Sequence, residues 1–419
     1  MAETLTKGPG GGETRPPVES PNGSSPVSLR QLNRGRVIEA LRIAGVASRA
    51  DVSRRTGLSR STVSSLISEM ADEGLVVDHG GLSPADHASQ AGRPPKMIRL
   101  GRPAGAAVGI DLGKRHAAVA VADLGHTVLA ESRRELDEGY DAGTGMDACA
   151  QLVDAVLQEG RVDRADVVGV GLGLPGPIHR ETGQVGSTAI LPGWGGVHVA
   201  EEMEGRLGLP VQVDNDANLG ALAELFWGAG QGAESLVYLK VATGIGAGLV
   251  IDRKLFYGAG GTAGEIGHLT IDEDGPICRC GSRGCLETLA AAPAIVELLR
   301  SSLGHELTIE EVIERAVAGD PGCRRAIADA GRHVGHAVAT MCNLVNPERV
   351  VVGGSVGLAR ELLLEEMRDA VRRWAIASAA EDAEIVAGVL GERAEVLGAV
   401  ALVLSSAERP AMPAVGAVG

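Results

Sequence analysis

Aromatic residues are nearly absent from this sequence, which has two Phe, three Tyr and three Trp in 419 residues. Its cores must therefore be built mainly from Ala, Val, Leu and Ile. Long apolar runs are missing as well, because no uninterrupted stretch approaches the roughly 20 residues that span a bilayer. A chain this long exceeds one ordinary domain, so we expect two or three cores. Because it has no apolar run long enough to span a membrane, we also expect a cytoplasmic protein without a membrane partner.

Cysteines are also few. Six in a chain of this length cannot form a disulfide scaffold, and a reducing compartment disfavours disulfides. Three of the six fall within eight residues, in the segment "CRCGSRGC" from Cys278 to Cys285. A cluster of this kind is more typical of a metal site or a redox site.

The negative net charge of −15 hides an asymmetry along the chain. Residues 30–100 carry eleven Lys or Arg against seven Asp or Glu, whereas residues 101–419 carry a net charge of −18. Acidic bulk repels nucleic acid, but a local basic patch can still contact phosphates. The asymmetry therefore indicates DNA contact confined to the N-terminal part, although a solvated helical face would give the same charge pattern.

The pattern divides the chain into a tail, a small domain and a large body. Residues 1–28 are rich in Gly, Pro, Ser and charge, which predicts a disordered tail. Residues 29–100 form the small domain. Residues 101–419 form the body, with two α/β lobes at about 105–225 and 226–405 and a short flexible tail.

The small domain contains a predicted helix-turn-helix. A helix runs from Leu32 to Gly45, Ser48 and Asp51 form a capping box for a short helix to Thr56, and Ser59 caps a helix that continues through Glu73. Apolar residues at helical spacing give this last helix a buried stripe. Its other face and N-terminal end offer side chains that could meet DNA, namely Arg60, Ser61, Thr62, Ser64 and Ser65. A three-helix bundle without a role in DNA binding is the alternative.

Two short strands, "LVVDHGG" and "PPKMIRL", are expected to form a wing after this helix. The segment "GRPP" between them holds Arg93 on an extended backbone, where it could enter a minor groove. A plain linker explains this tetrapeptide equally well.

The body alternates strands and helices from Val108 onward. Three consecutive strands precede a helix and a buried strand, and a similar run of strands around a glycine turn begins near Glu234. This repetition predicts duplicated α/β halves around a cleft.

Several motifs then resemble those of one family. They are "GLPGPI" (173–178), "LPGW" (191–194), "VDNDANLGALAE" (213–224), "ATGIGAGLV" (242–250), "GEIGH" (264–268) and "CRCGSRGCLE" (278–287). From about Leu32 to about Ser405 the chain resembles the ROK family (repressors, open reading frames and kinases), in its branch with an N-terminal winged helix-turn-helix. The resemblance implies a duplicated actin-like, or ribonuclease H-like, α/β fold behind a winged helix-turn-helix domain.

The motif "DNDAN" carries the sugar chemistry in this resemblance. A sugar kinase needs a carboxylate that accepts the hydroxyl proton during phosphoryl transfer, and Asp216 would be that base, with Asn215 beside it. In a sensor the same pair binds sugar hydroxyls, and a local Asx-turn cluster is a third interpretation. The resemblance adds Glu265, His268 and Glu287 to the sugar site. Ile190 departs from the family pattern, in which many relatives have Asn before "LPGW".

Cys278, Cys280, Cys285 and His268 make a complete tetrahedral ligand set for structural zinc. The upstream histidine matches the zinc motif of the family. A redox site is disfavoured, because no Cys-x-x-Cys pair stands at a helix start.

The nucleotide side of the cleft departs from the kinases. Kinases of the family begin with a turn of the form D-x-G-G-T-K, but this chain has "DLGKRH", with Lys114 and Arg115 where Gly and Thr let phosphates approach. Gly244 and Gly246, and Gly353 and Gly354 near the adenosine position, are retained. These four glycines fit a vestigial nucleotide site or tight turns of the fold.

The combined prediction is a sugar-responsive transcriptional regulator, most simply a repressor of carbohydrate genes, without enzyme activity. It would bind a double-stranded DNA operator and a sugar or sugar phosphate, as a homodimer or homotetramer. The alternatives are an ATP-dependent sugar kinase fused to a DNA-binding domain, and a scaffold for a transport or signalling protein.

Overall fold

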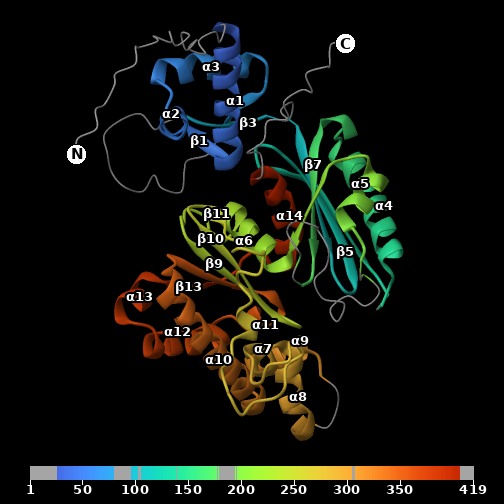
Figure 1. Ribbon diagram of the computed structural model, residues 1–419, viewed down its shortest axis with the longest axis vertical. Helices are drawn as coiled ribbons and strands as arrows, with labels where there is room; N and C mark the ends of the chain where they lie inside the picture. The colour runs from blue at the N-terminus through green and yellow to red at the C-terminus, as the bar shows by residue number, and fades with distance from the viewer. Residues whose placement is uncertain are drawn as a thin grey trace, which may run out of the picture.

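The computed structural model describes residues 26–79, 96–101, 105–137, 139–176, 178, 194, 196–303 and 307–405. These residues form a small N-terminal head and two α/β lobes (Figure 1). The head lies above the body in this view, with the first lobe, in cyan and green, to its lower right. The second lobe, from yellow to red, lies below. The chain therefore has the predicted small domain joined to a duplicated body.

Local capping explains the helices of the head. Its elements are α1 (Pro26–Ala44), β1 (Val46–Ser48), α2 (Arg49–Thr56), α3 (Arg60–Asp72), β2 (Val76–His79) and β3 (Met97–Leu100). Ser48 and Asp51 form the predicted capping box at the start of α2. The side chain of Ser59 accepts a hydrogen bond from the Thr62 amide at the start of α3. Gly57, with φ of 69°, makes the turn between the two helices, so the helix-turn-helix has its predicted limits.

The head also contains features that the sequence pattern missed. β1 pairs with β3 and completes a three-stranded antiparallel sheet in the order β1-β3-β2. Three residues are too few to show a strand periodicity. The limit predicted for the N-terminal tail, residue 28, falls inside α1. The predicted arm with Arg93 lies outside the described residues.

The two lobes repeat one sheet topology. The first lobe has β4 (Ala106–Leu112), β5 (His116–Asp123), β6 (Val128–Glu135), β7 (Val167–Leu174) and β8 (Val211–Asn215), in the order β6-β5-β4-β7-β8. The second has β9 (Leu236–Val241), β10 (Ile245–Ile251), β11 (Lys254–Leu255), β12 (Arg349–Gly353) and β13 (Glu384–Ala387), in the order β11-β10-β9-β12-β13. In both sheets three antiparallel strands are followed by two parallel ones. This repetition confirms the predicted duplicated, actin-like fold.

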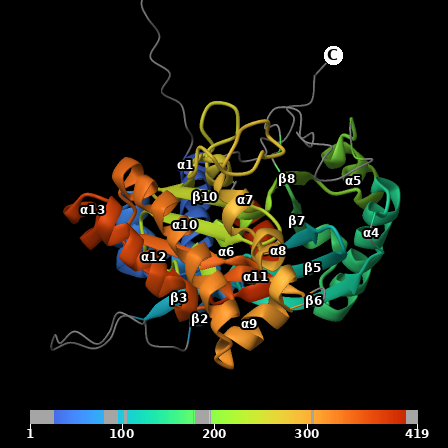
Figure 2. The ribbon, with the colours of Figure 1, turned by 90° about the horizontal axis from the view of Figure 1, so that it is seen from below.

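Helices form three layers around the two sheets. The outer face of the first sheet is covered by α4 (Ala142–Gly160) and α5 (Val199–Leu207). The second lobe adds α7 (Leu286–Ala290), α8 (Ala292–Leu303), α9 (Ile309–Val317), α10 (Pro321–Val345), α11 (Gly354–Gly357), α12 (Glu361–Trp374) and α13 (Ala377–Asp382). Figure 2 shows α4 and α5 at one side of the molecule and α10, α12 and α13 at the other. Between the sheets lie α6 (Asp216–Trp227) and α14 (Ala394–Ser405).

Alternation of side-chain size along β5 explains this arrangement. Val119 and Val121 belong to the cluster under α4, whereas Ala118, Ala120 and Ala122 belong to the cluster that contains α14. Successive side chains of a strand point to opposite faces. The small side chains on the inner face let α14 approach the sheet closely.

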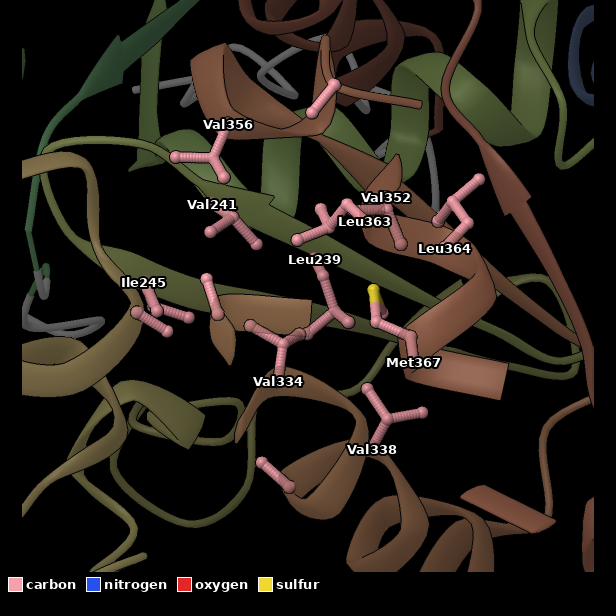
Figure 3. Packing of buried hydrophobic residues seen from close by; sticks show 14 of the residues in the cluster. Leu239, Val241, Ile245, Val334, Val338, Val352, Val356, Leu363, Leu364 and Met367 are labelled. Atoms are coloured by element: carbon pink, nitrogen blue, oxygen red, sulfur yellow. The ribbon is translucent and has the colours of Figure 1, made fainter. Parts of the chain in front are cut away.

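Aliphatic side chains fill the core of the second lobe. Leu239 and Val241 of β9 and Val352 of β12 meet Val334 and Val338 of α10 (Figure 3). Leu363, Leu364 and Met367 of α12 close the cluster. A core with so few aromatic residues therefore follows the expectation from the composition.

The lobe boundary differs from the one expected between residues 225 and 226. That position lies inside α6. The C-terminal helix α14, expected in the second lobe, packs on β4 and β7 of the first. Among the described residues, no helix combines the length and the apolar character needed to cross a membrane.

Candidate functional site

The motif "DNDAN" joins β8 to α6, and its polar side chains have separate roles. Asp214 accepts hydrogen bonds from the Tyr257 hydroxyl at 2.7 Å and from the Asn218 side-chain amide at 2.8 Å. The side-chain oxygen of Asn215 caps α6 by accepting from the Asn218 amide at 2.8 Å. Local capping therefore occupies part of this motif, including the oxygen of the predicted sugar ligand Asn215.

Asp216, the predicted base, is held in an ion pair. The Lys240 ammonium of β9 lies 3.0 Å from Asp216 Oδ2 and 2.6 Å from Glu395 Oε1, at the start of α14. The Lys240 side chain is 22% exposed. Burial disfavours its charge, but the carboxylates of Asp216 and Glu395 outweigh that cost and hold the pKa of Lys240 well above its usual range. The two neighbouring carboxylates therefore favour the charged form of Lys240.

Asp111 of β4 completes this group, which we call the lysine cluster (Asp111, Asp216, Lys240 and Glu395). Its charge acts on both Lys240 and Glu395, and its Oδ2 lies 2.7 Å from His116 Nε2. Burial raises the pKa of Glu395 even though Lys240 opposes the shift. The cluster thus joins β4, α6, β9 and α14, and places one lysine among three carboxylates.

The predicted phosphate turn lies between β4 and β5. Lys114 and Arg115 are exposed there, next to the buried Asp111. Two of the four retained glycines have reasons in the fold itself. A Cβ at Gly353 would clash with the Tyr238 ring, and Gly354 has φ of +80°. A Cβ at Gly244 would approach only the carboxylate end of the Glu287 side chain, at 2.8 Å, and one at Gly246 would meet Ala217 at an ordinary 3.4 Å. Gly353 and Gly354 are therefore explained without a nucleotide.

Glu265 and Glu287, both of the second lobe, lie near Asp216. Burial raises the pKa of Glu265, and the charges of Glu287 and Asp216 add to that shift. Glu287 accepts hydrogen bonds from the Ile245 amide at 3.2 Å and from the Arg279 guanidinium at 2.9 Å. Carboxylates from three segments therefore face one region, an arrangement suited to binding hydroxyl groups.

The metal-ligand candidates His268, Cys278, Cys280 and Cys285 come together, with all four ligand atoms within 4.8 Å of one another. Cys278 Sγ lies 3.6 Å from His268 Nδ1, and the sulfurs of Cys280 and Cys285 lie 3.7 Å apart. Zinc–sulfur bonds of about 2.3 Å in a tetrahedron place ligand atoms about 3.8 Å apart. The donor set and its spacing thus fit a structural zinc ion.

His268 belongs to the metal-ligand candidates and also lies beside Glu265, one of the carboxylates near Asp216. It ends a 3₁₀ turn (Ile266–His268), with Nδ1 near Cys278 and Nε2 3.8 Å from the Glu265 carboxylate. A ring held in this way by a metal would orient Glu265, because a ligand histidine and the carboxylate beside its other ring nitrogen orient each other.

Comparison with known proteins places this geometry in a family. The model of the ROK family matches residues 107–406, and the model of the IclR helix-turn-helix domain matches residues 35–80. The chain belongs to the ROK family.

Similar ROK proteins include both regulators and kinases. The chain is 31% identical to a xylose repressor of Caldicellulosiruptor bescii, over 90% of this chain and 96% of the repressor. It is 32% identical to a glucokinase of Thermotoga maritima, over 71% of this chain and 96% of the kinase. The crystal structure of a ROK family transcriptional regulator, a homologue of Escherichia coli MLC protein, covers 90% of this chain and 96% of its own, with 27% identity and a TM-score of 0.72. The repressor and the regulator structure match the head as well as the body.

The head of this ROK chain presents the predicted DNA-facing residues unequally. Arg60, Ser61 and Ser65 are exposed, whereas Thr62 and Ser64 are partly buried. Ser64 accepts a hydrogen bond from the Arg49 guanidinium of α2 at 2.9 Å. Arg49 is therefore a further candidate at this surface that the helix pattern did not single out.

Sequence reasoning also missed Lys240 and Glu395 in the ROK body. Each is a charged residue in an otherwise apolar segment, "LVYLKV" and "AEVLGAVALVL". A buried charge requires a partner, so two isolated charges of opposite sign were the available signal. Their separation of more than 150 residues hid the pairing.

Proposed function

We propose that this protein is a sugar-responsive repressor that binds operator DNA through its head and a sugar through its body. The observation that carries the proposal is the union, in one chain, of a helix-turn-helix head and a ROK body whose Asp216 is held by Lys240. The similar proteins named repressors support this assignment because they match the same two parts. The protein would act in the cytoplasm, where its DNA is.

In this proposal the head contacts DNA through the exposed end of α3. Arg60 and Ser61 would meet base edges or phosphates in the major groove, and Arg93 would follow the adjacent minor groove. One small head gives little specific affinity, and paired half-sites need paired heads. We therefore propose a homodimer or homotetramer.

The sugar would lie between the lobes. Asp216, Glu265 and Glu287 would accept hydrogen bonds from its hydroxyls, with Asn215 and His268 as further donors. A zinc ion on His268 and the three cysteines would fix the loop that carries Arg279 and the start of α7, which carries Glu287. The ion would have a structural role, because a filled four-ligand shell leaves no position for a reactant.

Kinase activity is the second candidate, because kinases of the family match the body. A kinase needs a carboxylate that is free to accept a proton and a site for the charged phosphates and their metal ion. In this chain the Lys240 ammonium is bonded to Asp216, and Lys114 and Arg115 occupy the turn that would approach the phosphates. We therefore propose that the cleft binds a sugar without phosphorylating it.

The experiment is a selection of bound duplexes from random DNA, followed by titration of the selected duplex. D-xylose, D-glucose and N-acetyl-D-glucosamine, each with and without a phosphate group, would be added as probes. We expect Arg60→Ala to weaken binding at least tenfold, about 1.4 kcal/mol, within the 1–3 kcal/mol typical of one good base contact. Arg300→Ala, an exposed change on α8, is the control.

Failure to select any duplex would contradict the proposal. An assay of ADP release with the same sugars and ATP separates the two candidates. Turnover that is lost in Asp216→Asn would establish the kinase instead.

A further inference from the structure

The central helix α6 runs from the lysine cluster to the underside of the head. It begins at Asp216, in the lysine cluster, and ends at Phe226 and Trp227. Its twelve residues span about 18 Å at the usual rise of 1.5 Å per residue. Buried residues of α6 pack on β9 and β12 through Tyr238 and Val351. A helix packed in this way moves as a unit, because close-packed interiors transmit displacement.

The far end of α6 meets His126, which lies in the turn between β5 and β6. The His126 ring lies 4.8 Å from the ring of Phe226 and 5.7 Å from that of Trp227. Trp227 Nε1 donates a hydrogen bond to the His126 carbonyl at 2.8 Å. His126 therefore follows the position of the end of α6.

The same histidine touches the head. Its Nε2–H donates to the carbonyl of Arg42 in α1. A Cβ at Gly45, between α1 and β1, would come within 2.6 Å of His126 Nδ1. His126 itself has φ of 68°, a left-handed conformation that costs a non-glycine residue free energy and often marks a functional position. The ring is thus fixed between α6 and the backbone of the head.

The second central helix, α14, runs between the same two regions. Glu395 near its start bonds to Lys240 at 2.6 Å, and the carbonyl of Val403 near its end accepts a hydrogen bond from Arg42 Nη1 at 3.0 Å. Leu219 and Leu222 of α6 form one cluster with Ala399 and Leu402 of α14. Figure 1 shows α6 and α14 beneath the head and between the lobes. Both helices therefore begin at Lys240 and end at contacts with Arg42 or His126.

We propose that α6 and α14 carry the state of the lysine cluster to the DNA-binding head, and that His126 is the positioning residue that couples them to α1. This inference rests on the proposed function. A ligand that alters the contacts of Asp216 shifts α6 against α14, and the ring of His126 transfers the shift to Arg42. Small shifts of packed helices are an established means of changing domain positions. The coupling is an energy between two sites, so it is measurable as such.

The test perturbs the cleft without any sugar. Lys240→Gln removes the charge that joins both helices, and Trp227→Phe keeps an aromatic ring but removes the hydrogen bond to His126. Affinity for a selected DNA duplex is measured for the wild type, each single variant and the double variant. We expect Lys240→Gln to change DNA affinity at least fivefold when it is made in the wild-type protein. When it is made in the Trp227→Phe protein, we expect a change of less than twofold. His126→Asn, which tolerates positive φ, should reduce the effect in the same way.

Trp374→Phe is the matched control. Trp374 is exposed on α12 and stacks on His336, with ring centroids 4.8 Å apart, so it repeats the tryptophan–histidine contact far from the head. It should leave the fivefold effect of Lys240→Gln intact.

The inference is overturned if Lys240→Gln leaves DNA affinity unchanged, or changes it by the same factor in both backgrounds. If no duplex can be selected, the proposed function fails, and hydrogen exchange then tests the linkage by itself. Lys240→Gln should speed amide exchange in residues 38–48 of the wild type at least threefold, and much less in Trp227→Phe. Equal acceleration in both backgrounds would refute the linkage.

Discussion

Two four-residue clusters organise the body, and they differ in the source of their cation. The lysine cluster holds its positive charge in the chain itself, on Lys240. The cluster of His268, Cys278, Cys280 and Cys285 has the donor set and spacing for zinc, and in our proposal it takes its cation from solution. The first is always present once the protein folds. The second would make the edge of the proposed sugar site depend on metal supply.

Removing one ligand of the proposed zinc site has the largest expected effect on stability. Cys285→Ser should reduce zinc from about one ion per chain to almost none by elemental analysis. Structural zinc contributes roughly 10 kcal/mol or more to isolated peptides. The loop here rests on a folded lobe, so we expect a smaller loss, about 5 kcal/mol, in urea unfolding. Cys342→Ala, a buried cysteine of α10, should keep the zinc. Wild-type protein that folds without zinc would contradict the site.

The lysine cluster should respond next. Lys240→Met leaves the Asp216 and Glu395 carboxylates without their cation, and breaking one side of a buried ion pair costs about 3–5 kcal/mol. Adding Glu395→Gln should recover part of this loss, because it removes one of the two stranded charges. The free energy of unfolding is measured in denaturant for the wild type, the single variant and the double variant. If the single variant were as stable as the wild type, the cluster would have no structural role.

The junction between head and body sharpens the comparison, since it combines the Arg99–Asp123 ion pair with hydrogen bonds from Arg42 and His126 to backbone carbonyls. Burial lowers the pKa of His126 from 6.5 to about 4. Below pH 6.5 the unfolded chain binds a proton that the folded protein excludes, so stability should fall as the pH drops from 6.5 to 4. The loss should be about 3 kcal/mol, because each pH unit between the two pKa values contributes about 1.4 kcal/mol. His126→Asn should show a correspondingly flatter pH dependence, and equal slopes would exclude His126 as the source.

The smallest effect on stability is expected for the ion pair between Arg279 and Glu287. Arg279 connects the zinc loop to Glu287, but its side chain is 40% exposed. Exposed ion pairs contribute at most about 1 kcal/mol, so Arg279→Gln should barely change stability. A loss of stability well above about 1 kcal/mol in thermal unfolding would contradict this prediction.

The comparison also explains which parts of the site could be predicted from sequence. The metal ligands fall within 18 residues, so their spacing alone indicated the set. Asp111, Asp216, Lys240 and Glu395 are spread over nearly 300 residues, and the fold alone brings them together. Asp216 was predicted from the motif around it, whereas its partner Lys240 lies in a segment that reads as an ordinary buried strand.

The fold shows the same division. Caps and periodicity predicted α2 and α3 nearly to the residue, because those signals are local. The place of α14 against the first sheet depends on contacts with β4 and β7, far away in the sequence. His126 was missed for the same reason: nothing near it in the chain reveals that α1 and α6 meet at its ring.

The middle layer formed by α6 and α14 limits the substitutions that this protein can accept. Gly109 and Gly171 face the backbone of α14, and Gly398 faces that of α6, so even one methyl group at these positions would push a helix away from its neighbour. The two central helices therefore tolerate almost no enlargement along their shared length. A substitution that changes ligand specificity without separating these helices would therefore lie outside the middle layer, at the edge of the proposed sugar site. Specificity would then change while the packing of α6 against α14 is kept.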